Sequence, residues 1–527
     1  MKAFRKDSFF QISLLQILLV YLLFALFLLP FYQYQINPDG VSYIGIAQKY
    51  LAGNFKDAVN GYWGMFYPLL LVPFLALPIT PLLAGKLLAL FLGSLLITGF
   101  YSLAGIFSVS QKVKILSSVA LIPPALYFAY SVTTSDLLLT TLLLFYHRPL
   151  FDPRYGKSAK PALLCGLIGG LAYLTKQYAL PFFLVHFFLA NIIYYKFGEI
   201  NVRKAALSFL SGLLVLLIIA GLWSAALTAK YGYFTLGTSG QYNTAIVGPF
   251  YQGQHPSDIN ILIPPPNSSA VSAWEDPGIV KVTPWNPLGS FGDLKYQFFI
   301  FRGNLPRIVT FLEIFSLFSV WIIIQSAFSI FRFGQLNSRN KVLTLIILYS
   351  IIVYTAGYSL LVVQERYLWP VFVLVLLLGA IQLDLVQKEF RNKVWITETI
   401  IMIFILSFMA NPVFNLLKNL NTGQEYFKQA LELRKIGIIN ANIAANTNGH
   451  TTAILAFESG NRYFGQTGDY RDTKSLIELL LKNKINYYLT RDTTSVNKEL
   501  DIFLPEISNN ALPSIKIYRV NSYQDGN

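Results

Sequence analysis

The sequence predicts an all-α polytopic membrane protein with a small α/β domain at its C-terminal end. Of the 527 residues, 54% are hydrophobic and only 13% are charged, whereas a soluble protein carries about 25% charged residues. Long apolar runs recur as far as residue 411, and beyond residue 420 charge returns and the apolar runs shorten. These observations predict a transmembrane domain over residues 1–412 and an extracytoplasmic domain over residues 420–527.

Charge and composition exclude several other classes. The net charge of +15 comes from basic residues in short loops, so it indicates membrane orientation and not nucleic-acid binding. The single cysteine, Cys165, excludes a disulfide framework or a thiolate metal site. The four histidines lack the paired spacing of a metal site; they are His147, His186, His255 and His450.

The apolar runs predict about eleven membrane crossings, at about 20 residues per crossing. The first run, residues 9–31, follows the short basic stretch Met1–Lys6. The bulky Pro30-Phe31-Tyr32 follows it in place of a small-residue cleavage site, so we expect an uncleaved anchor. The further spans are 81–108, 115–132, 134–147, 161–177, 179–195, 205–228, 307–331, 342–362, 368–386 and 395–411.

Basic residues in alternate loops set the predicted orientation. Under this threading they all lie on the side of the N-terminus, as the positive-inside rule requires. They are Lys112 and Lys114; Arg148, Arg154, Lys157 and Lys160; Lys196, Arg203 and Lys204; Arg332, Arg339 and Lys341; and Lys388, Arg391 and Lys393. We therefore expect a multi-pass protein of the cell (inner) membrane, with a cytoplasmic N-terminus. The outer loops 33–66 and 229–305 and everything after residue 412 then lie outside.

The first outer loop, 33–66, contains a short predicted helix over residues 40–52. Pro38 disfavours helix at the residue before it, and Gly53-Asn54 supplies a stop. Its apolar face suits a membrane surface and consists of Val41, Ile44, Ala47 and Leu51. The proline-broken stretch 67–78 is too short to cross with ease, so we expect a re-entrant or interfacial piece.

The long outer loop and the C-terminal region complete the predicted organisation. At about 75 residues, loop 229–305 is far longer than an ordinary connection, which is typical of a functional or mobile segment. Residues 473–483 have the pattern of an amphipathic helix. Strands are expected at Thr452–Phe457, Ile485–Thr490 and Ile515–Val520.

Ionisable residues at the outer boundary of a membrane domain are costly and therefore informative. Asp39 lies at the N-terminus of the predicted surface helix, and Asp136 lies at the outer start of the fourth span. Each has a structural alternative, because Asp caps helices and the helix dipole favours an acid there. Lys176 and the pair Glu365-Arg366 lie in outer turns. For both cations the alternative is snorkelling to lipid headgroups, or an ion pair in the case of Arg366.

Two carboxylates and several cations at helix ends beside the lipid suit glycosyl transfer from a lipid-phosphate sugar. A phosphate leaving group departs as an anion and needs no general acid, unlike the alkoxide of glycoside hydrolysis. Such an enzyme needs one base for the proton of the acceptor hydroxyl and cations that hold the phosphate. A single displacement of this kind inverts the anomeric carbon.

At these residues the sequence resembles the GT-C superfamily of integral membrane glycosyltransferases. It is most similar to the branch with protein O-mannosyltransferases and the lipid A aminoarabinose transferase. The resemblance covers the order of spans over about residues 10–412. The local motifs are Asn37-Pro38-Asp39-Gly40, Tyr67-Pro68-Leu69, Asp136, the Gly-rich helix over 166–176 that ends in Lys176, and Glu365-Arg366-Tyr367-Leu368-Trp369-Pro370. In the family, the acid at the position of Asp39 is the catalytic base.

The resemblance implies the GT-C fold and a polyprenyl-phosphate sugar donor. The predicted catalytic residues are Asp39 and Asp136, and the predicted substrate-binding residues are Tyr43, Tyr67, Lys176, Glu365 and Arg366. The sequence departs from the family in two places. Gly40 follows Asp39 where the O-mannosyltransferases have a second acid, and Leu69 follows Pro68 where they have a second proline.

Two other functions remain open at this point. A lipid-linked glycan polymerase or ligase would carry key basic residues in its large outer loop, where this chain has Lys230, Lys281, Lys295 and Arg302. A transporter or flippase of lipid-linked sugars would show inverted repeats, and the sequence contains no evident repeat. The acceptor is a glycan, a lipid or a protein, the surroundings are membrane lipid, and no nucleic acid is expected. A divalent metal ion shared by Asp39 and Asp136 stays open.

Overall fold

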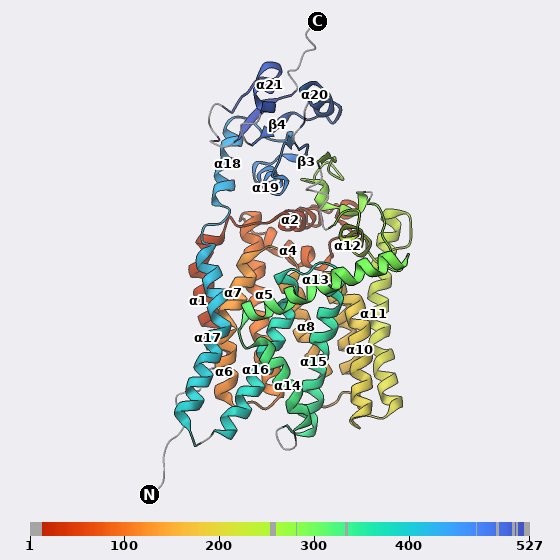
Figure 1. The fold of residues 1–527 in the computed structure, drawn as a ribbon, viewed down its shortest axis with the longest axis vertical. Helices are drawn as coiled ribbons and strands as arrows, with labels where there is room; N and C mark the ends of the chain where they lie inside the picture. The colour runs from red at the N-terminus through yellow and green to blue at the C-terminus, as the bar shows by residue number, and fades with distance from the viewer. Residues whose placement is uncertain are drawn as a thin grey trace.

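The computed structural model shows a helix bundle with a small α/β domain at one end (Figure 1). The end of the bundle that faces this domain is called the outer end below. The described residues are 13–252, 260–280, 282–332, 336–390, 392–468, 470, 472–491, 495–508, 512 and 515–520. The basic stretch 1–6, the first residues of the predicted span 9–31, His255, Lys281 and Arg391 lie outside them.

Eight helices of the described chain are long and apolar enough to cross a membrane, when a helix and its short continuation count as one. They are α1 (Leu14–Tyr32), α5 (Pro81–Ile106), α6 with α7 (Gln111–Ala120 and Ile122–Ser131), α10 (Ala179–Lys196), α11 (Val202–Tyr231), α15 (Ser338–Ser359), η3 with α16 (Glu365–Leu368 and Trp369–Glu389) and α17 (Val394–Lys418). Two predicted spans correspond to shorter helices that pack against each other. These are α8 (Asp136–Leu150) with 15 residues and α9 (Ala159–Thr175) with 17.

The predicted span 307–331 is broken, because two helices meet there at a sharp bend. Helix α13 (Phe291–Phe315) and helix α14 (Ser319–Phe331) enclose an angle of 97°. Ser316 between them has extended backbone dihedrals, which end the first helix. Figure 1 shows α13 running obliquely across the outer part of the bundle, whereas α14 runs along it. Helix α13 also begins inside the stretch predicted as loop 229–305.

Burial separates the centre of the bundle from its surface. Helix α16 is the central helix, with 89% of its apolar window buried. In α1 only 17% is buried, and in α11 and α17 only 28%. Their exposed Leu, Phe and Ile side chains therefore suit contact with lipid, since no polar face replaces them.

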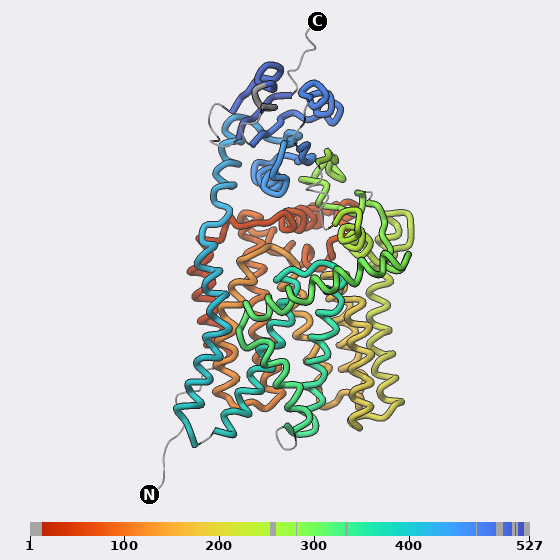
Figure 2. The backbone as a smooth tube through the Cα atoms, in the orientation of Figure 1, coloured from red at the N-terminus to blue at the C-terminus, as the bar shows by residue number. Residues whose placement is uncertain are grey.

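Short helices form a layer between the bundle and the C-terminal domain. They are α2 (Pro38–Leu51), α3 (Phe55–Ala58), α4 (Phe66–Leu75), α12 (Ser239–Val247), η1 (Ala273–Glu275) and η2 (Pro277–Ile279). The predicted helix over 40–52 is confirmed, and α2 crosses the end of the bundle (Figure 2). Its expected membrane-facing surface is wrong, because α2 is buried from Gly40 to Ala47 and packs between α4, η1 and α19 of the C-terminal domain.

The C-terminal domain is built on a five-stranded sheet in the order β1-β3-β2-β4-β5. Its strands are β1 (Ile261–Leu262), β2 (Asn442–Ala445), β3 (Arg462–Gln466), β4 (Tyr487–Thr490) and β5 (Lys516–Arg519), and its helices are α18 (Gln424–Lys435), α19 (Gly449–Ser459), α20 (Thr473–Lys482) and α21 (Ser495–Phe503). The expected strands at β4 and β5 and the expected helix at α20 are confirmed.

The strand expected at Thr452–Phe457 is wrong, since these residues lie in helix α19. Strands β2 and β3 are parallel neighbours, and parallel neighbours need a crossover connection, which α19 supplies. The long outer loop contributes the edge strand β1, which pairs antiparallel with β3. The loop and the C-terminal domain therefore share one sheet.

Candidate active site

The N-terminal ends of α2 and α8 lie together at the outer end of the bundle. Asp39 is in the first turn of α2, and Asp136 is the first residue of α8. The N-cap of α2 is Asn37, so Asp39 is not a plain helix cap. The Asn37 side chain accepts a hydrogen bond of 2.9 Å from the backbone N–H of Thr133, which ties the start of α2 to the turn before α8.

Four of the predicted site residues form one chain of alternating charge. Lys176 Nζ lies 2.5 Å from Asp136 Oδ1, and Arg366 Nη1 lies 2.7 Å from Asp39 Oδ2. Arg366 Nε is 3.7 Å from Asp136 Oδ2, so the guanidinium lies between the two carboxylates. The Thr134 hydroxyl donates to Asp136 Oδ2 at 2.8 Å. We call Lys176, Asp136, Arg366 and Asp39 the charge chain.

The local backbone explains how the two cations reach this place. Lys176 is the C-cap of α9 and has extended dihedrals, which turn it out of the helix. Its ammonium lies 3.8 Å from the ring centre of Tyr367, a cation–π contact. Arg366 lies in the short turn η3, where Nε also donates to Gln364 Oε1 at 2.9 Å. Both cations thus have partners within the protein.

The other predicted site residues surround the charge chain without joining it. The Tyr43 hydroxyl is 2.7 Å from Ser135 Oγ, next to Asp136. Tyr67 is buried and packs edge-on against the Tyr43 ring at 5.0 Å. The Glu365 carboxylate accepts a hydrogen bond of 3.1 Å from the Tyr127 hydroxyl.

A tryptophan of the long outer loop also contacts the charge chain. Trp274 Nε1 donates to Asp39 Oδ1 at 3.0 Å. The Trp274 carbonyl accepts from Trp63 Nε1 at 2.9 Å and from Ser42 Oγ at 3.2 Å, so α2 and the first outer loop hold this residue in place. In the sequence this loop stood out by its length, and no pattern in it distinguished Trp274 from the other residues.

Residues 270–276, which we call the outer strap, are fastened by a second ion pair. Glu275 forms a buried ion pair with Lys49 of α2, and both side chains are 4% exposed. A Cβ at Gly45 would lie 2.6 Å from Glu275 Oε2, so a side chain at this position would have to displace the carboxylate. Burial raises the pKa of the Glu275 carboxyl, and the Lys49 ammonium opposes that rise. Lys230 secures the end of the strap through Asp276 at 2.7 Å.

Comparison with known proteins finds likeness in structure. No family model matches the sequence, and no curated protein sequence matches it. The structure of ArnT from Cupriavidus metallidurans bound to undecaprenyl phosphate has a TM-score of 0.58 and 13% identity, and the match covers 95% of this chain and 97% of that one. The Archaeoglobus fulgidus oligosaccharyltransferase in its apo form has a TM-score of 0.54 and 10% identity, over 92% of this chain and 70% of that one. The chain has the GT-C fold.

The sequence left open a divalent metal ion shared by Asp39 and Asp136. Among the described residues, no group of three or more His, Cys, Asp and Glu side chains could hold a metal ion. Arg366 contacts both Asp39 and Asp136, so an ion bound by both carboxylates would have to displace the guanidinium.

The structure also brings together two histidines that the sequence placed far apart. His147 Nε2 and His186 Nε2 lie 2.8 and 2.7 Å from Ser350 Oγ. The Tyr146 hydroxyl lies 2.9 Å from His186 Nδ1. All four residues are inside the bundle, where such hydrogen bonds join helices α8, α10 and α15. Spacing in the sequence cannot reveal this cluster, because its members lie on three helices.

Proposed function

We propose that the protein is a membrane glycosyltransferase. It moves a sugar from a polyprenyl-phosphate donor to an acceptor hydroxyl at the outer end of the bundle. The observation that carries the proposal is the charge chain, in which Lys176 and Arg366 stand beside two carboxylates at helix ends. The likeness to ArnT, whose structure holds undecaprenyl phosphate, supports a lipid phosphate as the donor's leaving group.

The chemistry needs one base and two cations. The acceptor oxygen attacks the anomeric carbon, and its proton passes to an Asp39 carboxylate oxygen. The bond between the anomeric carbon and the phosphate oxygen breaks, and the lipid phosphate leaves with the electron pair. Lys176 and Arg366 stabilise the charge that develops on it. Because one displacement occurs, the configuration at the anomeric carbon inverts.

Because Arg366 also contacts Asp39, it can influence how readily this carboxylate accepts a proton. In the structure, Arg366 and Trp274 both donate to the Asp39 carboxylate, and donors to the charged form reduce its tendency to accept a proton. A lipid phosphate that binds Arg366 competes with Asp39 for the guanidinium. Binding of the donor would therefore weaken the ion pair between Arg366 and Asp39, so Asp39 could accept a proton more readily. The ion pair with Asp136 would keep Lys176 in place.

We further propose that the outer end of the bundle faces the extracytoplasmic side of the cell (inner) membrane. The alternate placement of basic loops supports this orientation. It puts the charge chain where a lipid-linked sugar and an envelope acceptor can meet. The structure gives little support to the polymerase or ligase alternative, because Lys230, which lies at the end of α11, pairs with Asp276 within the protein.

An Asp39→Asn variant tests the assignment. Asn keeps the size and one acceptor oxygen but is not a base, so we expect transfer to fall by about 10²-fold or more. The assay uses protein reconstituted in vesicles, radiolabelled polyprenyl-phosphate sugars and membrane extract as the source of acceptor, with and without a chelator. Asp57→Asn is the matched control, since Asp57 lies in the same outer loop and contacts Asn54 instead of the charge chain.

Near-normal transfer by the Asp39→Asn variant would remove this residue from the mechanism. Loss of transfer in the Asp57→Asn control as well would attribute the effect to folding of the loop. Loss of wild-type activity on addition of the chelator would show that a metal ion takes part.

A further inference from the structure

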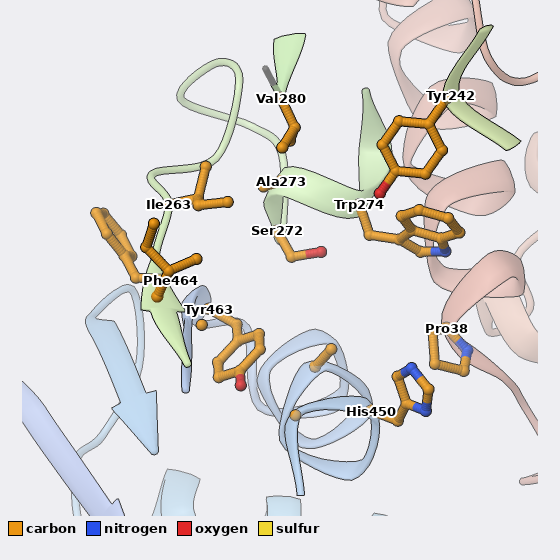
Figure 3. Close-up of a pocket in the computed structure, with 14 residues that line it drawn as sticks. Pro38, Tyr242, Ile263, Ser272, Ala273, Trp274, Val280, His450, Tyr463 and Phe464 are labelled. Atoms are coloured by element: carbon orange, nitrogen blue, oxygen red, sulfur yellow. The ribbon is translucent and has the colours of Figure 1, made fainter. Parts of the chain in front are cut away.

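A pocket opens between the C-terminal domain and the outer loops, beside the start of α2 (Figure 3). It holds about 560 Å³ of space free of atoms, open solvent at its mouth included. Its lining includes Pro38 of α2, Tyr242 and Trp274 of the long outer loop, and His450, Ala453 and Phe464 of the C-terminal domain. We call it the aromatic pocket.

We propose that the aromatic pocket binds a neutral sugar ring of the acceptor. The inference rests on the proposed function and extends it in two ways. It names the acceptor as an uncharged glycan, and it gives the C-terminal domain the task of completing the acceptor site.

The lining chemistry selects an uncharged ligand. Among the described residues, none of those that line the pocket is Asp, Glu, Lys or Arg. A phosphate or carboxylate would lose its hydration there without gaining a cation, which is unfavourable. The cations Lys176 and Arg366 stand instead in the charge chain, where the leaving phosphate would bind. The uncharged acceptor would thus bind in the aromatic pocket, and the phosphate of the donor would bind at the charge chain.

The pocket combines aromatic faces with a few polar groups. Trp274, Tyr242 and Phe464 offer flat apolar surfaces, and His450 and Ser272 offer hydrogen-bonding atoms. Figure 3 shows these side chains arranged around the opening, with His450 close to Pro38. Such a mixture suits a sugar ring, whose C–H faces are apolar and whose rim carries hydroxyls. A fully apolar ligand would leave the polar groups unsatisfied.

The pocket is next to the proposed base. Pro38 lines it and directly precedes Asp39. Trp274 lines it with its ring and also donates to Asp39 Oδ1 at 3.0 Å. A hydroxyl on the α2 side of a bound ring would therefore be the one nearest the carboxylate that takes its proton. Lys176 ends α9 and Arg366 lies in η3, so both cations come from the bundle.

The pocket is assembled from segments far apart in the chain. Strand β1 of the outer loop pairs with β3, and the backbone N–H of Tyr463 donates to the Val271 carbonyl at 2.7 Å. These contacts join the outer strap to the sheet that carries Phe464. Removing the C-terminal domain would therefore remove one wall of the pocket and leave the charge chain in place.

The test is binding of small probes to the full-length protein, in a detergent without a sugar headgroup. Saturation-transfer NMR would compare methyl glucoside, methyl mannoside and methyl galactoside with glucose 6-phosphate and a capped serine tripeptide. Ala453→Phe fills the pocket from α19, and His450→Ala removes an exposed polar group with little risk to folding. Leu481→Phe adds aromatic bulk elsewhere in the same domain and is the matched control.

We expect at least one neutral glycoside to bind and its signal to fall at least fivefold in Ala453→Phe. In the transfer assay, the same variant and His450→Ala should raise the KM for acceptor at least fivefold, while binding of undecaprenyl phosphate stays unchanged. Leu481→Phe should behave like the wild type in both assays.

Stronger binding of the sugar phosphate or of the peptide than of every glycoside would overturn the inference. So would an unchanged acceptor KM in both pocket variants of a protein that transfers sugar. The proposed function fails separately, when the wild-type protein transfers no sugar, whatever the binding of the probes shows.

Discussion

The Lys49–Glu275 pair, which we call the sealed pair, and the charge chain each include a residue of α2 and differ in how far they are exposed to solvent. In the first, both side chains are 4% exposed. In the second, exposure runs from 6% for Asp136 to 24% for Lys176. Water and ligands can reach the charge chain, whereas they cannot reach the sealed pair. The difference suggests that one set of charges fixes structure and the other exchanges partners during turnover.

Breaking the sealed pair should cost more free energy than breaking an ion pair of the charge chain. A buried charge that loses its partner costs about 3–5 kcal/mol, because it keeps its desolvation penalty without compensation. A charge near solvent regains water and costs much less. Substitutions in the sealed pair should therefore lower the free energy of unfolding. Substitutions in the charge chain should lower the rate of sugar transfer.

The largest effect is expected for Lys49→Met. It leaves Glu275 buried without its cation, so we expect the free energy of unfolding to fall by about 3–5 kcal/mol near pH 8. Burial already raises the pKa of Glu275, and the lost ammonium would raise it further. Protonation then relieves the cost, so the loss should be smaller at pH 5 than at pH 8. Thermal unfolding of the variant at both pH values measures this.

The double variant Lys49→Met with Glu275→Gln is the control for that prediction. It removes both charges, so it should recover most of the lost stability. Equal stability of the single and double variants would show that the sealed pair does not fix the outer strap.

Glu458 of α19 extends the comparison, because it is a buried carboxylate that forms no ion pair with the described residues, although Arg434 lies near enough to oppose the rise in its pKa. Its Oε1 atom has no hydrogen-bond partner among the described residues, and Arg434 donates to the Glu458 backbone carbonyl instead of the carboxylate. Burial raises the pKa of Glu458 to about 7. The stability linked to this group is complete below its unfolded pKa of about 4.3. It is lost as the pH rises through 7.

The C-terminal domain should therefore lose about 2 kcal/mol between pH 5 and pH 7.5. Hydrogen exchange in α19, corrected for the intrinsic effect of pH, measures the loss. Glu458→Gln should abolish this pH dependence. An unchanged pH dependence in that variant would assign the effect to other groups.

Much of the bundle and of the charge chain follows from the sequence for a physical reason. Apolar runs near membrane length report helices directly, and a helix lies at each predicted position, although α13 and α14 divide one of them. Acids and bases at membrane boundaries are rare and costly, so Asp39, Asp136, Lys176 and Arg366 stood out and lie together in the structure.

The remaining features depend on contacts between distant segments, which composition does not reveal. Trp274 meets Asp39 across 235 positions of sequence. The β1 strand has only two residues and exists because β3 offers an edge. The apolar pattern of Thr452–Phe457 suited a strand, and the need to connect two parallel strands made it a helix. Local patterns cannot supply this information.

In the charge chain, Arg366→Lys should cost about tenfold in kcat/KM for transfer, or about 1.4 kcal/mol. Lysine keeps the charge but loses the planar fork that reaches Asp39 and Asp136 at once. The free energy of unfolding should change little, in contrast to Lys49→Met. Wild-type transfer by Arg366→Lys would show that a single point charge suffices, and the role of Arg366 in holding both carboxylates would then be wrong.

The smallest effect is expected for Glu432→Gln, which breaks an exposed ion pair on α18. Lys435 Nζ lies 2.7 Å from Glu432 Oε1, with the two side chains 69% and 36% exposed. Lys435 ends the helix, where the dipole favours a cation even without its partner. We expect a loss below about 0.5 kcal/mol in thermal unfolding, and less at high salt. A loss as large as that of Lys49→Met would mean that burial does not set the cost of breaking these pairs, and the contrast between the sealed pair and the charge chain would lose its basis.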